Sequence, residues 1–443
     1  MTVPNTTFDG ILPTLTAIFE RHREASKKLG RILINRDLNG RIRLILDEKY
    51  EHDQSGGQEA KTLAQEIALK LGPHAFPAEQ SLLFEPDFDQ VFEREITFPL
   101  EEFDHIFVVD RLATESNWST IEPLSENCPR IVFYSIKGGV GRSTALAISA
   151  WAMAEQGKKV LVLDLDLESP GLSSALLPED RRPTYGITDW LVEDLVDNGD
   201  VIFQDMVATS NLSRQGEIWV VPAYGTDPGE YISKLSRVWM PKFKNDGAKE
   251  PWFKRLARLI GSLELRLKPD VVLIDSRAGI DEIASTIVTD LGASLILMFA
   301  INGSQTWSGY HILFEHWRKT GGVRNLRKQL QIVAAMVPEV GATGYFTSLG
   351  ENAWNLFTDK LYDEIKPEMD APEEEFLNTE EPWNFDLNDS EAPHFPWSVR
   401  WHRGFAALKN LYDGMELDEK TITAVFGDLI LGVGKLVDSS QEM

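Results

Sequence analysis

The sequence predicts an α/β protein in which a mostly parallel, doubly wound sheet follows a small α+β domain. From residue 131 onward, short apolar runs without polar alternation recur between amphipathic helical stretches. Such runs are typical of parallel strands that helices cover on both faces. The first run continues through a glycine-rich turn into a helix. Residues 1–127 differ, because they combine helical stretches with a hairpin signal.

Composition limits the class of protein. The 443 residues carry 69 acidic and 44 basic side chains, a formal net charge of −25, and 43% of them are hydrophobic. This is the balance of a folded protein with two or three domains. The lone Cys128 excludes a disulfide framework, a cysteine-rich zinc site and an iron–sulfur cluster on one chain. The start lacks signal-peptide features, and no run approaches the ~20 apolar residues of a membrane span. We therefore expect a cytoplasmic protein that does not bind membranes.

Residues 1–127 are predicted to form the small α+β domain, which we expect to bind a partner or to regulate the rest of the chain. Asn39-Gly40 lies between two short apolar runs and is a strong two-residue hairpin signal. The expected elements are a helix at 8–19, strands at 31–35 and 41–46, a helix at 57–71 and a strand at 105–109.

Residues 128–443 are predicted to form the larger α/β domain. The pattern weakens between about residues 338 and 393, which we interpret as an insertion. Within it, residues 363–391 hold 12 carboxylates against one lysine, Lys366, so the segment is either a partner surface or a solvated loop. Residues 421–437 are expected to form a core-packing helix. The expected strands are 131–136, 159–164, 217–222, 271–275, 294–300 and 330–337.

The strongest motif is the glycine-rich turn Lys137-Gly-Gly-Val-Gly-Arg-Ser-Thr144, which precedes a helix at 145–156. Glycines let backbone N–H groups converge on an anion, and the helix N-terminus adds partial positive charge. The alternative is an ordinary turn between strand and helix. The predicted nucleotide-binding residues of the turn are Gly138, Gly139, Val140, Gly141, Arg142, Ser143 and Thr144.

This turn resembles the deviant Walker A motif of ParA/MinD-type P-loop ATPases, and the resemblance extends from residue 130 to the C-terminus. It implies an ATPase that uses ATP and Mg²⁺. In that family the early lysine, here Lys137, reaches across a homodimer to the partner's nucleotide. The resemblance therefore implies that ATP binding drives dimerisation and that Lys137 acts in catalysis.

Arg142 stands where the family has its second lysine, and the loop resembles a variant branch with the sequence KGGVGR. Arginine keeps the positive charge and can bind phosphate through two N–H groups, but its planar fork is larger and less adaptable than an ammonium. We expect Arg142 to bind phosphate and to act in catalysis. Because binding should survive the change more readily than hydrolysis, turnover is expected to be slow or absent.

Three aspartates follow two predicted strands. Asp164 ends the strand 159–164 and Asp166 follows two residues later, while Asp275 ends the strand 271–275. By resemblance they belong to switch I (residues 164–171) and switch II (residues 275–282). The resemblance implies that Asp166 orients the attacking water, and that Asp164, Asp275 and the hydroxyl of Ser143 hold Mg²⁺. The alternative for Asp164 and Asp166 is that they cap the next turn.

Two further residues of switch II are of interest. Gly279 is expected to donate a backbone N–H near the γ-phosphate. Arg277 stands where the related pattern has proline, and it could sense phosphate, contact a partner chain or lie on the surface.

Recognition of the base is less defined. Phe395, Pro396 and Trp397 resemble a late segment of the family that packs on adenine, although they could instead pack in the core. The strand 330–337 ends in Met336, where relatives often carry an asparagine that recognises the base.

Two basic stretches could contact a nucleic-acid backbone or could be solvated helix faces. Residues 21–43 contain eight cations, and a second stretch extends from Lys242 to Lys268.

Together these features predict an ATP-binding switch that dimerises with ATP and hydrolyses it slowly. Residues 1–127 and the acidic insertion would engage a partner protein, and the family branch suggests a regulator in a bacterial conflict or antiviral defence system. One alternative is a ParA-like ATPase that binds DNA. Another is a scaffold that locks ATP without hydrolysing it.

Overall fold

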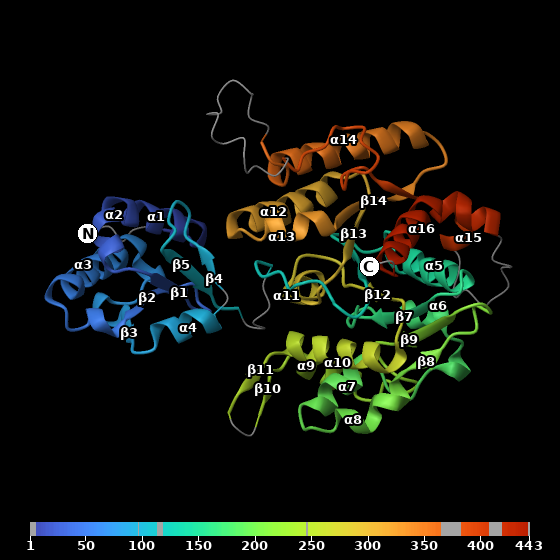
Figure 1. Cartoon of the computed structure of the whole chain (residues 1–443), viewed down its shortest axis with the longest axis horizontal. Coiled ribbons are helices and arrows are strands. Elements are labelled where there is room, and N and C mark those ends of the chain that lie inside the picture. The colour runs from blue at the N-terminus through green and yellow to red at the C-terminus, as the bar shows by residue number, and fades with distance from the viewer. Residues whose placement is uncertain are drawn as a thin grey trace. The chain divides into compact units, whose positions relative to one another are not determined.

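The computed structural model describes residues 6–95, 97–112, 118–244, 247–364, 382–406 and 419–441. The chain divides into two compact units, and Figure 1 shows both. The first comprises residues 1–120 with 319–321, and the second comprises residues 121–318 and 322–443.

The first unit contains a five-stranded mixed sheet of order β3-β2-β1-β5-β4. The predicted hairpin is confirmed, because β1 pairs antiparallel with β2, but its connection is longer than the two residues expected: the last paired residues are Arg36 and Ile42, and Gly40 in the turn has φ +76°. β1 also pairs parallel with β5, and β2 with β3. The strands are β1 (Ile32–Arg36), β2 (Ile42–Asp47), β3 (Leu82–Glu85), β4 (Thr97–Pro99) and β5 (Ile106–Asp110).

Helices cover both faces of this sheet. Apolar residues at helical spacing on α1 (Ile11–Arg21) and α3 (Gln54–Leu71) are buried in one core with Ile34 and Val108. A smaller cluster on the opposite face joins α4 (Phe88–Arg94) to Leu33 and Val109. The short α2 (Arg23–Lys28) follows α1.

The second unit contains an eight-stranded sheet of order β15-β14-β13-β6-β12-β7-β9-β8. All neighbouring pairs are parallel except β8 with β9. The predicted α/β fold with a mostly parallel sheet is therefore confirmed. The strands are β6 (Arg130–Ser135), β7 (Lys159–Asp164), β8 (Ala208–Thr209), β9 (Glu217–Val221), β12 (Val271–Asp275), β13 (Leu295–Ala300), β14 (Leu330–Val337) and β15 (Trp397–Arg400).

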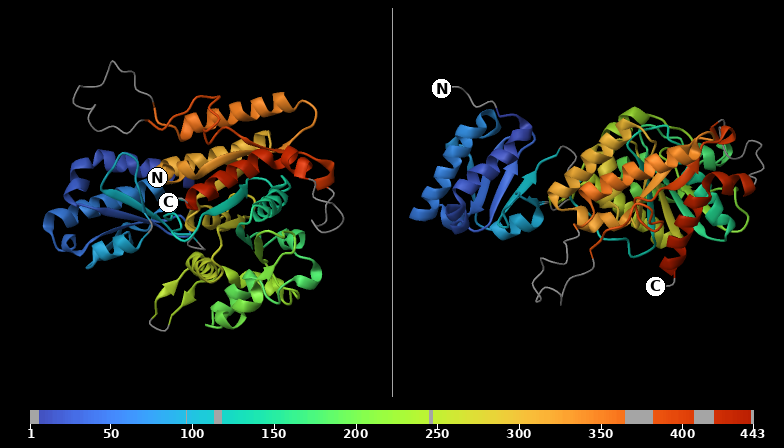
Figure 2. Two further views of the ribbon diagram at one scale, coloured as in Figure 1. Left: turned by 45° about the vertical axis from the view of Figure 1, so that its right-hand side comes forward. Right: turned by 90° about the horizontal axis from the view of Figure 1, so that it is seen from above.

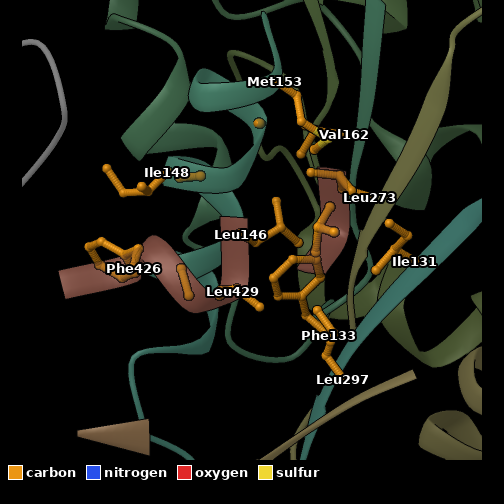
Figure 3. Close-up of a cluster of buried hydrophobic side chains, with 14 of the residues drawn as sticks. Ile131, Phe133, Leu146, Ile148, Met153, Val162, Leu273, Leu297, Phe426 and Leu429 are labelled. Carbon is orange, nitrogen blue, oxygen red and sulfur yellow. The ribbon is translucent and has the colours of Figure 1, made fainter. Parts of the chain in front are cut away.

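Helices pack on both faces of the large sheet. On one face, α5 (Arg142–Glu155) and α16 (Glu419–Gln441) bury their apolar sides against alternate strand residues, as expected for a strand period of two. Figure 3 shows Phe426 and Leu429 of α16 near Leu146 of α5. On the opposite face, Tyr134 of β6 meets Tyr310 of α12 (Ser304–Thr320), with ring centroids 6.4 Å apart.

The remaining helices lie between the strands in the chain. The two-stranded hairpin of β10 (Lys242–Phe243) and β11 (Lys249–Glu250) extends away from the large sheet in Figure 1 and in the left view of Figure 2. The helices are α6 (Leu172–Leu176), α7 (Ile187–Asp194), α8 (Gly199–Ile202), α9 (Tyr231–Val238), α10 (Trp252–Leu267), α11 (Glu282–Ser285), α13 (Val323–Leu326), α14 (Ala342–Lys360) and α15 (Arg403–Ala406). None of the helices in the described ranges is long and apolar enough to cross a membrane.

The ends of the acidic insertion are fixed to the second unit. Arg327 binds the Asp363 carboxylate through both terminal nitrogens, at 2.7 and 2.9 Å, and its guanidinium lies over the Trp383 ring at 4.7 Å. The backbone N–H of Trp383 donates to the same carboxylate at 2.9 Å. Most of the acidic segment, residues 365–381, lies outside the described residues.

Candidate functional site

A pocket of about 570 Å³ lies beside the glycine-rich turn between β6 and α5. β6 lies between β12 and β13 in the sheet. After β6 the chain continues to β7, on the β12 side, and it later returns to form β13 on the other side. Ligands of open α/β sheets bind at such a reversal, outside the carboxyl ends of the strands. The pocket is lined by Ser135, Gly138, Gly139, Val140, Gly141, Arg142, Ser143, Thr144, Asp166, Glu168, Ser169, Arg277 and Ala278.

The turn has the backbone geometry of an anion cradle. Gly139 and Gly141 have φ of +75° and +80°, which residues with side chains rarely adopt. A Cβ placed on Gly138, Gly139 or Gly141 would meet no atom within 4 Å, so open space lies above the turn. α5 begins directly after Gly141, and its first N–H groups and dipole favour negative charge there. The turn therefore fits the phosphates of a nucleotide.

Arg142 is buried in the floor of this pocket and bridges two carboxylates. Its Nε donates to Asp275 Oδ1 at 2.7 Å, its Nη2 to Asp166 Oδ2 at 3.1 Å and its Nη1 to the Ser135 hydroxyl at 3.2 Å. The Arg142 side chain is only 7% exposed. The predicted phosphate-binding arginine is thus held between switch I and switch II.

The predicted metal residues lie close to this bridge. The Ser143 hydroxyl donates to Asp275 Oδ2 at 2.5 Å. Asp164 is fully buried, and neither of its carboxylate oxygens has a hydrogen-bond partner among the described residues. Burial, together with the charges of Asp275 and Asp166, raises the pKa of Asp164 to about 8. Burial also raises the pKa of Asp166.

These oxygen donors fit Mg²⁺. Magnesium takes oxygen ligands, keeps several waters and is usually held in proteins by one or two side chains together with substrate phosphates. Within the described ranges, no cluster of three or more His, Cys, Asp or Glu side chains is arranged to hold a metal ion by itself. A cation at Ser143 and Asp275 would therefore depend on phosphate oxygens for the rest of its ligands.

Lys137 differs from its neighbours in the turn. It is exposed, it does not line the pocket, and it makes no ion pair within the described part of the chain. Its ammonium is thus available to a group outside the chain's own pocket.

Switch II contacts switch I at the mouth of the pocket. Arg277 Nη1 lies 2.6 Å from Glu168 Oε1, and Arg277 Nε lies 3.1 Å from Asp281 Oδ2. Gly279 does not line the pocket: its N–H donates to the Ser135 carbonyl at 3.0 Å, and its own carbonyl accepts from the Tyr134 hydroxyl. The N–H expected near a γ-phosphate is therefore already used.

A second, smaller pocket of about 70 Å³ shares Val140, Gly141 and Thr144 with the first. Its other walls come from the carboxyl ends of β14 and β15 and from α15 and α16. Met336 has the unusual φ of +53° beside a register shift between β14 and β15, and buried His402 Nδ1 has no hydrogen-bond partner among the described residues. The other lining residues are Val399, Arg400, Trp401, Phe405 and Phe426.

The residues predicted for base recognition line neither pocket. Phe395 packs against Phe346, with ring centroids 5.9 Å apart, and Pro396 lies near Gly350. The Trp397 ring packs against Gly432 of α16, where an added Cβ would lie 2.4 Å away. The physical reason is the direction of β15: residues 395–397 are at its amino end, whereas the pocket is at its carboxyl end. The same direction brings residues 399–402 to the second pocket.

Carboxylates of the same unit pair with most cations of the first basic stretch and with part of the second. Between residues 21 and 43, seven of the eight cations form ion pairs, and the eighth, Arg43, lies over the Phe76 ring at 3.7 Å. In the second stretch, Asp194 is bound by Lys242, Arg255 and Arg258 at 2.8 to 3.1 Å. The first stretch is therefore not an unopposed positive surface of the kind that binds phosphate backbones, whereas Lys254 and Lys268 of the second stretch are exposed and form no ion pair among the described residues.

Comparison with known families places this site in context. The sequence model of the CobQ/CobB/MinD/ParA nucleotide binding domain matches residues 131–369, which is more than half of the chain. Two iron–sulfur cluster carrier proteins are similar over short segments. The one from Salmonella typhimurium is 46% identical over 54 residues, 12% of this chain and 15% of its own length. The one from Methanocaldococcus jannaschii is 37% identical over 76 residues, which are 17% of this chain and 26% of its own length. The chain thus spans about a quarter or less of the length of these relatives.

Solved structures with similar folds include those of a ParA protein and a MinD protein. The structure of pNOB8 ParA bound to nonspecific DNA is 15% identical and covers 71% of this chain and 99% of its own, with a TM-score of 0.41. The septum site-determining protein MinD from Pyrococcus horikoshii OT3, complexed with Mg-ADP, is 20% identical. It covers 48% of this chain and 71% of its own, with a TM-score of 0.33.

Proposed function

Because the chain belongs to the CobQ/CobB/MinD/ParA nucleotide-binding family, we propose that it is an ATP-dependent molecular switch that dimerises with ATP and controls a partner protein. The observation that carries this proposal is the composition of the pocket wall. The glycine-rich turn lines one pocket together with Asp166, Glu168 and Ser169 of switch I and with Arg277 and Ala278 of switch II. A nucleotide whose phosphates lie on the turn would therefore share one pocket with both switches.

Each part of the site has a role in this proposal. The glycine N–H groups and the α5 N-terminus bind the phosphates, and Asp166 orients the attacking water. Mg²⁺ would be held by Ser143, Asp275 and Asp164, and it would supply charge neutralisation between the phosphates. The uncompensated burial of Asp164 supports this assignment, since a buried carboxylate without partners is costly unless it meets a cation or a proton.

The second pocket is proposed to hold the base. It adjoins the turn through Val140, Gly141 and Thr144, and its wall is mainly apolar and aromatic. Aromatic side chains can stack on any base, and His402 Nδ1 offers one unpartnered polar atom for recognition.

Dimerisation is proposed from the exposure of Lys137, which does not line its own pocket. Light scattering of the full chain tests it. Addition of Mg·ATP should raise the mass from one chain to two, and Lys137→Ala should remain at the lower mass. Lys328→Ala is the matched control, because Lys328 is also an exposed lysine but lies at the amino end of β14. If wild type and Lys137→Ala have the same mass with and without nucleotide, the dimerising switch is wrong.

The output of the switch is proposed to be control of a partner, through the first unit and the acidic insertion. An additional α+β unit and a segment of 12 carboxylates exceed what nucleotide hydrolysis alone requires. The role in a bacterial conflict or antiviral defence system remains part of this proposal. A pull-down of the full chain with ATP and with ADP tests it, and the same proteins at the same yield in both would contradict control by ATP.

A DNA-binding ATPase is the second candidate, and the paired cations of both basic stretches count against it. It requires DNA affinity that depends on ATP and falls with salt. A scaffold that holds ATP without turnover is a third candidate, and the buried bridge made by Arg142 favours it. The cluster-carrying role of the named relatives is not proposed for this chain. With Cys128 as its only cysteine, even a dimer offers two thiolates where a four-iron cluster takes four ligands.

A further inference from the structure

The guanidinium of Arg142 uses its donors on the residues that surround the proposed metal position. Nε binds one oxygen of Asp275 at 2.7 Å, and Nη2 binds Asp166 at 3.1 Å. The other oxygen of Asp275 accepts from the Ser143 hydroxyl at 2.5 Å. Both oxygens of Asp275 are thus occupied, one of them by a positively charged group.

A divalent ion and this guanidinium compete for the same carboxylate. Mg²⁺ needs its ligands in an octahedral arrangement at about 2.0–2.1 Å. It would meet the Arg142 charge within a few ångströms, in a site where screening by water is weak. The Arg142 side chain is only 7% exposed, so it cannot relax into bulk solvent without leaving the bridge.

We propose that Arg142 is the resident cation of the Asp166–Asp275 pair, and that a divalent metal ion binds there only after nucleotide phosphate has drawn the guanidinium away. This inference rests on the proposed function of the same site. Arg142 lines the phosphate pocket and is the first residue of α5. Its guanidinium N–H groups can therefore leave the carboxylates of Asp166 and Asp275 and bind phosphate oxygens instead.

The exchange has a consequence for switch I. Among the described residues, the Asp166 side chain has two hydrogen-bond partners, the Arg142 guanidinium and the Ser169 N–H at 3.3 Å. Departure of Arg142 would free Asp166 from Asp275 and would leave the exposed Arg277–Glu168 ion pair and the Leu165 N–H to Asp275 carbonyl hydrogen bond to connect switch I with switch II. Arginine suits this role better than lysine, because a planar fork binds several fixed acceptors at once, whereas an ammonium acts as a point charge.

Binding of Mn²⁺ to the full chain without nucleotide, followed by the EPR signal of the free ion, tests the proposal. Arg142→Gln removes the resident charge, so it should bind one Mn²⁺ at least about tenfold more tightly than wild type. The gain should disappear in Arg142→Gln/Asp275→Asn. Arg327→Gln is the matched control: Arg327 is also a mostly buried arginine paired with a carboxylate, that of Asp363, but it lines neither pocket, so its loss should leave Mn²⁺ affinity unchanged. Equal Mn²⁺ affinity of wild type and Arg142→Gln would overturn the proposal.

A measurement on wild type alone keeps the test valid if Arg142→Gln does not fold. With saturating ADP, and after correction for Mn·ADP in protein-free buffer, wild type should bind Mn²⁺ at least about tenfold more tightly than without ADP. Tight Mn²⁺ binding without ADP would contradict the exchange. A separate measurement by equilibrium dialysis in EDTA determines whether ADP itself binds. Its absence would refute the proposed function, while the nucleotide-free comparison of wild type with Arg142→Gln would still decide the role of Arg142.

Discussion

Arg277 Nη1 and Glu168 Oε1 lie 2.6 Å apart, so that an ion pair joins switch II to switch I at the mouth of the pocket. Below it, Arg142 joins Asp166 to Asp275. The two links differ in burial: Arg277 and Glu168 are 28% and 41% exposed, whereas Arg142 is 7% exposed. Exposed ion pairs contribute about 0–1 kcal/mol. The outer link can therefore open at little cost, and the inner link determines how firmly the switches are held together.

Replacement of Arg142 by lysine is expected to accelerate hydrolysis. A lysine can follow the phosphates as a compact charge, whereas the guanidinium of Arg142 is fixed by Asp275, Asp166 and Ser135. We expect phosphate release under single-turnover conditions to rise at least about tenfold, which corresponds to ~1.4 kcal/mol of barrier. Arg324→Lys, on an exposed arginine outside both pockets, is the control. An unchanged rate of phosphate release in Arg142→Lys would mean that the arginine does not limit the rate of hydrolysis.

The second pocket is expected to contribute affinity for the base and none for the phosphates. His402→Ala should weaken ATP binding about tenfold, or ~1.4 kcal/mol, because its ring helps to form the pocket wall. The affinity of His402→Ala for tripolyphosphate, measured by competition, should equal that of wild type, because tripolyphosphate has no base. Phe395→Leu should leave both values unchanged, since Phe395 lines neither pocket. A larger effect of Phe395→Leu than of His402→Ala would place the base at residues 395–397.

Asp290 should make the protein less stable as the pH rises. It ends a π-helical turn, Thr286–Asp290, and one of its carboxylate oxygens has no hydrogen-bond partner among the described residues. Burial raises the pKa of Asp290 from 3.8 to about 8. Between these two values the unfolded chain loses a proton that the folded chain keeps. The contribution of Asp290 is thus fully present below pH 3.8 and is lost as the pH rises to about 8.

Asp290→Asn removes this titration. Urea denaturation between pH 5 and 7.5 should show a free energy of unfolding that falls less steeply in the variant, by up to ~1.4 kcal/mol per pH unit. The raised pKa of Asp164 acts in the same direction and remains in both proteins. Parallel pH curves for wild type and Asp290→Asn would show that the carboxyl group of Asp290 is not held protonated.

Glu264 is expected to be a strong determinant of stability. Its carboxylate binds Arg130 through two nitrogens at 2.7 and 2.8 Å and also accepts from Asn127 at 2.8 Å. Because the side chains of Glu264 and Arg130 are 1% and 10% exposed, Glu264→Ala leaves a buried guanidinium without its counterion. We expect a loss of ~3–5 kcal/mol in urea denaturation. Glu315→Ala, which removes a more exposed carboxylate paired with Arg318 and Lys360, should cost ~1 kcal/mol or less. Equal losses would contradict the importance of burial.

Much of the fold could be predicted because its strongest signals are local. The six apolar runs correspond to β6, β7, β9, β12, β13 and β14, with bounds within one residue or two. The Asn39-Gly40 signal marks the β1–β2 turn, and the residues predicted for the phosphate loop line one pocket. The short edge strands β8 and β15 were not predicted, because two and four residues carry too little periodicity to be seen in a sequence.

The interactions between distant residues could not be predicted. Arg142 lies 24 residues from Asp166 and 133 from Asp275, and only the folded sheet brings these side chains together. Likewise, the cations between residues 21 and 43 look like a basic patch in the sequence, although partners such as Glu59 and Asp89 neutralise them in space. Residues 395–397 were predicted to bind the base, but they line neither pocket. The pocket proposed for the base is lined by residues 399–402, farther along β15, because the local sequence does not reveal the direction of that strand.

Binding of a fluorescent ATP analogue to wild type and to Gly139→Ala tests most directly the claim that the glycine-rich turn holds nucleotide phosphates. Gly139 has φ +75° with open space where its Cβ would lie, and Gly157 at the end of α5 has φ +84° with similar space but no pocket. Both alanine variants carry a comparable backbone strain of ~1–2 kcal/mol. We expect affinity to fall at least about tenfold in Gly139→Ala and to remain unchanged in Gly157→Ala. Absence of binding to wild type, or equal affinity in all three proteins, would contradict a nucleotide site at this turn.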